Sequence, residues 1–338
     1  MEQENYHRGD KMAILVTGGA GYIGSHTLMA LLDRNEEVIV IDDLSKGHKY
    51  AVKGGKFYCG DLRDEDFLYT VFQQNEIEDV IHFAAYSLVG ESVKDPIAYY
   101  DNNVKGTITL LHCMKKYGVK NIVFSSTAAV YGEPEHIPIL EEDNTNPTNP
   151  YGESKLAIER LLKWSNNAGD INYIALRYFN AAGAHESGSI GEDHDPETHL
   201  IPIILETALG IREKIIIFGD DYDTPDGTCI RDYIHVMDIA QAHILALDKL
   251  RRQGRSGIYN LGNGAGFSVR EVIEKAKEIT GRNIPVEIGD RRPGDPAILV
   301  ASSEKAKEEL NWNPKYGDLG KIIEDAWKWH CTKISSIN

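Results

Sequence analysis

The sequence predicts an α/β protein: a doubly wound parallel sheet covered by helices on both faces, followed by a smaller C-terminal α/β domain. Three observations support this class. Short apolar runs alternate with segments of helical periodicity from Met12 to Phe179. The first apolar run leads directly into a cluster of glycines. Beyond Phe179 the pattern gives way to polar, turn-rich stretches, which indicate a second domain.

The strands of the expected sheet are short and apolar. They are expected at 13–17, 38–42, 56–59, 80–84, 121–125 and 171–177. Helical periodicity fills the intervening segments at 22–34, 64–74, 96–117 and 151–167. Because parallel neighbours need a crossover connection, this alternation predicts a Rossmann-type arrangement.

The rest of the chain is assigned mainly to the smaller domain. Helices are expected at 200–209, 236–250 and 269–280, and a strand at 257–261. The segment 236–262 is expected to return to the first domain. We therefore expect an N-terminal extension at 1–11, a Rossmann-type domain at 12–179, and a smaller second domain formed by 180–235 and 263–338.

Composition and charge narrow the possible partners. The 338 residues carry a formal net charge of -16, which argues against nucleic acid or an anionic membrane as a partner, since such surfaces need basic residues. No apolar run approaches the roughly 18 residues that cross a bilayer, and the N-terminus lacks a signal-peptide pattern, so a cytoplasmic protein is expected. The four cysteines are widely spaced and form no CxxC pair, which favours reduced thiols.

A glycine-rich turn after the first strand is the first candidate ligand site. The sequence TGGAGYIG places Gly18, Gly21 and Gly24 at three-residue intervals. Such a turn lets a pyrophosphate approach the backbone, and the following helix directs its first amides at the phosphates. Asp42 ends the second strand, where its carboxylate suits ribose hydroxyls and repels a 2'-phosphate. NAD is therefore favoured over NADP, and the adjacent Asp43 supports this choice.

A tyrosine and a lysine four residues apart form the candidate catalytic pair. Tyr151 and Lys155 lie on one face at the start of the helix expected at 151–167. A free tyrosine has a pKa of about 10, but a nearby ammonium and a positive nicotinamide ring favour the phenolate. The phenolate can remove a hydroxyl proton during hydride transfer. A Ser-Ser-Thr sequence ending at Thr127 closes an intervening strand, at the edge where open α/β sheets bind ligands.

Further motifs extend this pattern along the chain. TGGAGYIG, SSTAAVYG and PYGESK resemble the extended short-chain dehydrogenase/reductase family, and HFAA, RYFN, RDYIHV, YNLG and RRPGD continue the similarity from about Met12 to the end of the chain. Within this family the chain is similar to the nucleotide-sugar 4-epimerases. The resemblance implies a homodimer that reversibly epimerises UDP-glucose and UDP-galactose at C4, with NAD and through a 4-keto intermediate.

The resemblance also assigns roles to single residues. Tyr151 is the general base and acid, Lys155 binds the nicotinamide ribose and lowers the tyrosine pKa, and Thr127 hydrogen-bonds the sugar O4. The other residues expected to bind NAD, besides the glycines and aspartates above, are Tyr22, Ile23, Leu44, Ser45, Asp61, Leu62, Phe83, Ala84, Ala85, Asn102, Ser125, Tyr178 and Phe179.

The residues expected to bind the UDP-sugar come from the second domain. Arg231 and Arg292 suit the diphosphate because a guanidinium forks onto two oxygens, and Asp295 suits the uridine ribose. The full set, together with Thr127 and Tyr151, is Asn180, His199, Leu200, Phe218, Arg231, Arg292, Asp295 and Leu299.

Three positions depart from the family pattern. Ser87 replaces a common lysine near the cofactor, and His199 replaces an asparagine that normally bonds the substrate phosphates. Leu299 stands where some members carry a tyrosine at the back of the sugar pocket. Its smaller side chain would leave room for a 2-acetamido group, so N-acetylated UDP-sugars are a further hypothesis.

The residues that follow Thr127 disfavour a related reaction. Related dehydratases need an extra acid beside the catalytic threonine, where this chain has Ala128 and Ala129. Another nucleotide-sugar epimerase and a non-catalytic NAD-binding sensor remain alternatives. The acidic and histidine residues between 192 and 199 fit no metal-ligand spacing, so we expect a solvated loop and no metal.

Overall fold

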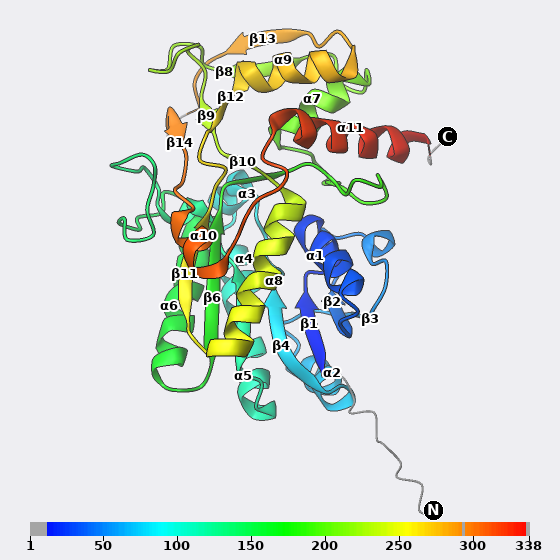
Figure 1. Ribbon diagram of the computed structural model, residues 1–338, viewed down its shortest axis with the longest axis vertical. Helices are drawn as coiled ribbons and strands as arrows, with labels where there is room; N and C mark the ends of the chain where they lie inside the picture. The colour runs from blue at the N-terminus through cyan, green and yellow to red at the C-terminus, as the bar shows by residue number, and fades with distance from the viewer. Residues whose placement is uncertain (1–11, 293–294, 336–338) are drawn as a thin grey trace, which may run out of the picture.

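The computed structural model describes residues 12–292 and 295–335, and its centre is a parallel sheet in the order β11-β6-β5-β4-β1-β2-β3 (Figure 1). The chain moves outward from β1 through β2 to β3, then crosses to β4 on the other side of β1. This reversal creates a topological switch point at the carboxyl ends of β1 and β4, where such sheets bind ligands. The strands are β1 (Ala13–Thr17), β2 (Val38–Asp42), β3 (Lys56–Cys59), β4 (Ile77–His82), β5 (Asn121–Ser125), β6 (Asn172–Tyr178) and β11 (Gly257–Leu261).

Helices cover both faces of the sheet because its central strands are apolar on both sides. In β1, Ile14 and Val16 pack toward α1 and α8, while Ala13 and Leu15 face the layer of α2, α5 and α6. The bounds are α1 (Tyr22–Asp33), α2 (Glu65–Gln74), α3 (Val89–Lys94), α4 (Pro96–Tyr99), a π-helical segment (Tyr100–Lys105), α5 (Gly106–Tyr117), α6 (Pro150–Asn167), α8 (Val236–Gln253) and α10 (Glu304–Leu310), with short 3-10 turns at Lys49–Ala51 and Ala128–Val130.

A smaller lobe lies over the carboxyl ends of the strands (Figure 1). It has its own apolar core, in which α7, α9 and α11 pack against β8. Its elements are β7 (Asn180–Ala182), α7 (Leu200–Ala208), β8 (Ile215–Phe218), β9 (Ile230–Arg231), β10 (Tyr233–His235), β12 (Phe267–Ser268), α9 (Val269–Thr280), β13 (Val286–Gly289), β14 (Ile298–Leu299) and α11 (Leu319–Ser335). β14 and β12 flank β9, β13 pairs with β8, and β10 pairs with β7.

The predicted fold class is confirmed, and five of the seven sheet strands have the predicted bounds. The helix expected at 96–117 is wrong in detail, because α4, a π-helical segment and α5 share that stretch. β8, β13, α3, α10 and α11 were not predicted. Among the described residues, no helix is both long enough and apolar enough to span a membrane.

Candidate active site

The turn between β1 and α1 is folded tightly on itself and on the end of β4. Gly18 has a φ of 71°, and a Cβ there would lie 2.6 Å from the amide nitrogen of Ala84. A Cβ on Gly24 would clash with the carbonyl oxygen of Gly18. Gly21 caps α1 without a side-chain hydrogen bond, so no side chain competes for the first amides of the helix. The turn therefore has the shape and the donors of a phosphate cradle.

Asp42 fixes the glycine turn to the end of β2. Its Oδ2 accepts from the amide of Ala20 at 3.0 Å, and its Oδ1 accepts from the amide of Leu44 at 2.9 Å. Burial raises the pKa of Asp42, and these two N–H groups oppose the rise. Each carboxylate oxygen keeps a second lone pair, so the group can still accept from ribose hydroxyls. Asp43 holds the next turn by accepting from the amide of Ser45 at 2.9 Å.

The start of α6 brings the two predicted catalytic side chains to the carboxyl edge of the sheet. Asn149 caps the helix by accepting from the amide of Gly152 at 2.9 Å. Lys155 is only 3% exposed, and its Nζ donates to the carbonyl oxygen of Ser125 at 2.8 Å. Burial lowers the pKa of Lys155 to about 7. Tyr151, one turn earlier, faces the same edge.

Two influences act on the pKa of Tyr151 in opposite directions. Burial raises its pKa, and a hydrogen bond with the Thr127 side chain opposes this rise. The lowering of this pKa by Lys155 stays a prediction; in the structure the Lys155 Nζ donates to Ser125, and burial disfavours its ammonium form. Thr127 and Tyr151 therefore form one unit, and a phenolate at Tyr151 requires a further positive charge.

A buried ion pair beneath the catalytic residues was not predicted. Glu159 lies one turn after Lys155, is 3% exposed, and accepts from Arg177 at 2.9 Å and 2.6 Å. The Ser126 hydroxyl donates to the same carboxylate at 2.5 Å. Arg177 also donates to the Tyr131 hydroxyl at 2.8 Å. A buried charge is rarely left unpaired. The sequence does not show that the glutamate on α6 and the arginine on β6 are partners, because only the fold brings them together.

The other residues expected to bind NAD lie along the same edge with differing constraints. Ser125 hydrogen-bonds Tyr178, while the Phe83 ring packs 4.5 Å from that of His243. Asp61 is held by Arg63, which lowers its pKa. The remaining positions lie in helices, at strand ends or in the core. Tyr22 and Ile23 begin α1, and Asn102 lies in the π-helical segment. Ala84 and Ala85 follow β4, Phe179 follows β6, and Leu62 packs in the core.

The expected substrate residues form two groups in the smaller lobe. In the first, Arg231 on β9 makes an ion pair with Asp295, and the Arg292 guanidinium lies 4.0 Å from the centre of the Phe218 ring. Leu299 pairs with Arg231 in the small sheet and packs against the apolar cluster of Ala128, Val130, Tyr131, Ile139 and Leu156. In the second group, His199 and Leu200 begin α7. Asn180 donates to the carbonyl oxygen of Asp232 at 3.2 Å.

The loop between β7 and α7 corrects one prediction. Glu192 and Glu197 are 5% and 8% exposed, so the expected solvated loop is wrong for these residues. His199 Nδ1 lies 2.8 Å from Glu192 and 3.1 Å from Glu197, and His194 Nδ1 lies 3.3 Å from Glu192. Sequence spacing could not reveal this cluster, because the irregular loop follows no helix or strand period.

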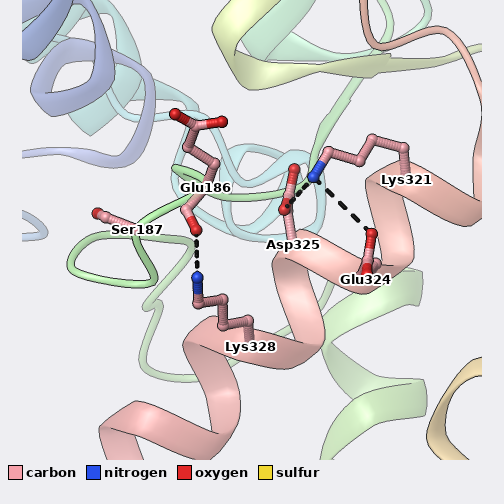
Figure 2. Close-up of a pocket in the computed structure, with 6 residues that line it drawn as sticks. All are labelled: Glu186, Ser187, Lys321, Glu324, Asp325 and Lys328. Atoms are coloured by element: carbon pink, nitrogen blue, oxygen red, sulfur yellow. Dashed lines mark hydrogen bonds and ion pairs between the residues drawn. The ribbon is translucent and has the colours of Figure 1, made fainter.

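A surface hollow between this loop and α11 has no part in the site. Figure 2 shows Lys328 donating to the carbonyl oxygen of Glu186 at 2.6 Å, and Lys321 pairing with Asp325 at 2.8 Å. None of the residues that line it belongs to the predicted site. The Lys328 contact ties the loop to α11, whereas the Lys321 contact lies within that helix.

Known proteins show the same organisation. Residues 14–262 match the NAD dependent epimerase/dehydratase family. UDP-glucose 4-epimerase of Halalkalibacterium halodurans is 63% identical over 319 residues, which cover 94% of this chain and 96% of that protein. UDP-glucose 4-epimerase from Bifidobacterium longum, solved in complex with NAD+ and UDP, is 43% identical with a TM-score of 0.90, covering 96% of this chain and 99% of that one.

A third relative differs in its stated substrates. The UDP-Glc/GlcNAc 4-epimerase of Campylobacter jejuni is 43% identical with a TM-score of 0.84, and the match covers 95% of this chain and 99% of that one. The family match spans both the glycine turn and the Tyr151–Lys155 pair. With its parallel sheet, its phosphate cradle and its tyrosine at the carboxyl edge, the chain belongs to the NAD-dependent epimerase/dehydratase family.

Proposed function

We propose that the chain interconverts UDP-glucose and UDP-galactose by inverting C4, using one NAD that is regenerated in each turnover. The observation that carries this proposal is the grouping of Thr127, Tyr151 and Lys155 at the carboxyl edge of the sheet, the edge that also carries the glycine turn. Relatives named UDP-glucose 4-epimerase support the choice of substrate. A protein that only senses NAD has no need of all three side chains.

The residues present fit NAD. The glycine turn leaves backbone N–H groups for a pyrophosphate, and a side chain at Gly18 or Gly24 would fill the space. In this proposal Asp42 binds the adenosine ribose and Lys155 binds the nicotinamide ribose. NAD supplies an acceptor for the hydride from C4 and returns it later; the proton chemistry belongs to the protein.

Tyr151 carries the proton in both half-reactions. As a phenolate it takes the proton of the 4-hydroxyl while the C4–H bond breaks, so the sugar becomes a 4-keto sugar. Thr127, which is hydrogen-bonded to Tyr151, holds O4 of the sugar in place. After the keto-sugar presents its opposite face, hydride returns to C4 and Tyr151 gives its proton back to O4. The product is the C4 epimer, and tyrosine is again a base.

Elimination is disfavoured by the residues that follow Thr127. Ala128 and Ala129 form a short 3-10 turn and carry no acid that could protonate a leaving hydroxyl. The 4-keto sugar therefore returns by reduction. This supports epimerisation over dehydration within the same family.

The nucleotide is the part of the substrate that must stay fixed while the sugar turns. Arg231 and Arg292 supply charge for the diphosphate, and Phe218 offers an apolar ring beside Arg292. Arg231 is paired with Asp295 in the structure, so substrate binding exchanges this ion pair for phosphate and ribose contacts. The sugar itself meets mainly Thr127 and Tyr151, which leaves it free to rotate.

N-acetylated UDP-sugars are a second substrate class that Leu299 supports. Leu299 packs beside Ala128 and Tyr131, next to the catalytic turn, so its size limits the space for a group on C2. The UDP-Glc/GlcNAc relative supports the same possibility. Leu299→Tyr should reduce turnover of UDP-N-acetylgalactosamine at least tenfold and spare UDP-galactose. Equal loss on both sugars, or inactivity of the unaltered chain on the N-acetylated one, would reject this second class.

A homodimer in the cytoplasm completes the proposal. Apolar side chains are exposed on α3, α4, α5 and α6, including Val93, Ile97 at 79% and Trp164 at 71%. Exposed apolar patches of this kind mark protein interfaces. Sedimentation analysis should give twice the chain mass, and Ile97→Asp should shift it toward the monomer.

Turnover tests the main proposal. The purified chain should convert UDP-galactose to UDP-glucose without added NAD, and Tyr151→Phe should lose at least about 100-fold in rate while keeping its NAD. Tyr69→Phe, at a half-buried tyrosine of α2 outside the predicted site, is the matched control. Full activity of Tyr151→Phe would refute the base assignment, and NAD binding without turnover in the unaltered chain would favour the sensor.

A further inference from the structure

Four metal-ligating side chains converge in the loop that joins β7 to α7. Each of Glu192, His194, Glu197 and His199 offers one ligand atom, and these atoms lie within 4.8 Å of one another. Of these four residues only His199 is expected to bind the substrate, and none takes part in the proposed proton chemistry. The cluster is therefore not explained by the reaction.

The spacing of the atoms matches a shared ion. Two ligands bound at about 2.0–2.1 Å to a tetrahedral ion lie about 3.3 Å apart. Here Nδ1 of His199 lies 2.8 Å from Glu192 Oε1 and 3.1 Å from Glu197 Oε1, and Nδ1 of His194 lies 3.3 Å from Glu192 Oε1 and 3.7 Å from Glu197 Oε2. The buried Nδ1 of His194 makes no hydrogen bond although both carboxylates are this close. A metal ion between the four atoms would bind this nitrogen directly.

The surroundings hold the ligands in place, as the outer partners of metal ligands do. Glu197 Oε1 accepts from the amides of Thr198 at 2.7 Å and His199 at 2.8 Å. The Tyr22 ring meets the His194 ring edge-on at 6.4 Å. Trp329 of α11 donates to the carbonyl oxygen of Glu192 at 2.9 Å. The cluster is thus fixed by α1, α7 and α11, which come from both lobes.

We propose that Glu192, His194, Glu197 and His199 bind one divalent ion of the zinc type, in a closed four-ligand site. Two imidazoles and two carboxylates suit Zn²⁺ better than the oxygen-preferring Mg²⁺ or Ca²⁺. Four protein ligands leave no position for a reacting group, so the ion is structural. It crosslinks the 192–199 loop beside the glycine turn.

Metal binding has one consequence for the site, and this consequence rests on the proposed function. With Nδ1 of His199 bound to the ion, the neutral ring carries its proton on Nε2. That nitrogen is then a fixed donor for a phosphate oxygen. A histidine could thereby replace the asparagine expected at this position.

Cobalt provides the test, because tetrahedral Co²⁺ has strong visible bands that water-bound Co²⁺ lacks. Chelator-treated, full-length protein is titrated with Co²⁺ alone and then with Zn²⁺. The bands should saturate at one equivalent per chain and disappear when Zn²⁺ displaces the cobalt. Zn²⁺ should also raise the melting temperature in a concentration-dependent way.

Matched variants separate this site from adventitious binding. His194→Gln and Glu197→Gln should lose the bands, whereas His185→Gln and Glu186→Gln, on the same loop, should keep them. His194 is partly exposed, and a melting transition with retained NAD shows that its variant is folded. The proposal is overturned if the unaltered chain gives no tetrahedral bands at one equivalent, or if His194→Gln keeps them. UDP-galactose turnover is measured separately, so failure of the proposed function would not imitate either result.

Discussion

Glu159→Gln would test the ion pair beneath the catalytic residues, because it removes one charge and changes the shape very little. Glu159 and Arg177 are both 3% exposed, and two hydrogen bonds join them in a fork. Glutamine can accept one of these bonds but cannot neutralise the guanidinium. Arg177 would keep only its neutral partners, among them the Tyr131 hydroxyl.

The expected loss is about 3–5 kcal/mol in the free energy of unfolding, the range for leaving one member of a buried ion pair uncompensated. The hydrogen bonds give a consistent figure, since each bond to a charged group contributes about 1.5–3 kcal/mol and the variant weakens two. Adding Arg177→Met removes the stranded charge. The double variant should therefore be more stable than Glu159→Gln alone.

Urea titration of the cofactor-free chain measures the free energy of unfolding of Glu159→Gln, Arg177→Met and the double variant. Glu153→Gln, on the same helix, is the control for a lost carboxylate. If Glu159→Gln costs less than about 1 kcal/mol, the pair is not structurally important. A double variant that equals the sum of the two single losses would refute the coupling. Glu159 also raises the pKa of Lys155, so the variant should further disfavour the ammonium and slow turnover at neutral pH.

Three further predictions concern the cofactor site. Gly24→Ala should abolish NAD retention, measured as nucleotide released on denaturation, because the methyl group would clash with the Gly18 carbonyl. Asp42→Ala should weaken NAD at least tenfold in calorimetry, since it removes a ribose acceptor and frees the turn; unchanged affinity would reject this role. The pKa of Lys155 is about 7 when folded and about 10.4 when unfolded, so the unfolded chain binds more protons between these values. Stability of the cofactor-free chain should therefore rise by up to about 2.7 kcal/mol from pH ~7.5 to ~9.5, and Lys155→Met should abolish this slope.

The first half of the fold was predictable because its signals are local. A strand such as β1 is apolar along its whole length, and glycine and proline residues mark the turns around it. The bounds of β2, β3 and β5 followed from the same pattern. β4 begins three residues before the predicted strand, because its first residues, Ile77–Asp79, include two acids. Asp79 accepts a hydrogen bond at 2.7 Å from Arg251, which lies on α8. Only the fold brings that arginine near.

The second lobe was less predictable because its strands are short and half exposed. β8 and β13 pair with each other across some 70 residues of sequence. The residues of β8 are all apolar although every second one is exposed, and β13 is exposed along most of its length. Long-range pairing of this kind leaves little trace in a local window. α11 is amphipathic, but its apolar residues are interrupted by charges that pair with the 184–193 loop.

Within the candidate site, the identities of the residues were easier to predict than their protonation states and their ion-pair partners. Tyr151, Lys155 and Thr127 were found from spacing alone or from family motifs, and the structure brings them to one edge. The protonation of Tyr151 could not be read from the sequence, because it depends on burial. The ion pair of Glu159 and Arg177 was equally invisible, since its members are 18 residues apart on a helix and a strand.

Burial links the two catalytic side chains to the charge of the cofactor. In the protein alone, burial disfavours both the phenolate of Tyr151 and the ammonium of Lys155, so the neutral pair is preferred near and above neutral pH. A positive charge beside Tyr151 favours the phenolate, and the phenolate in turn favours the ammonium. An oxidised, cationic nicotinamide bound at this edge would supply that charge, and Tyr151 would then act as the base. Without that charge the phenol prefers to keep its proton, which suits Tyr151 to protonate O4 in the second half-reaction.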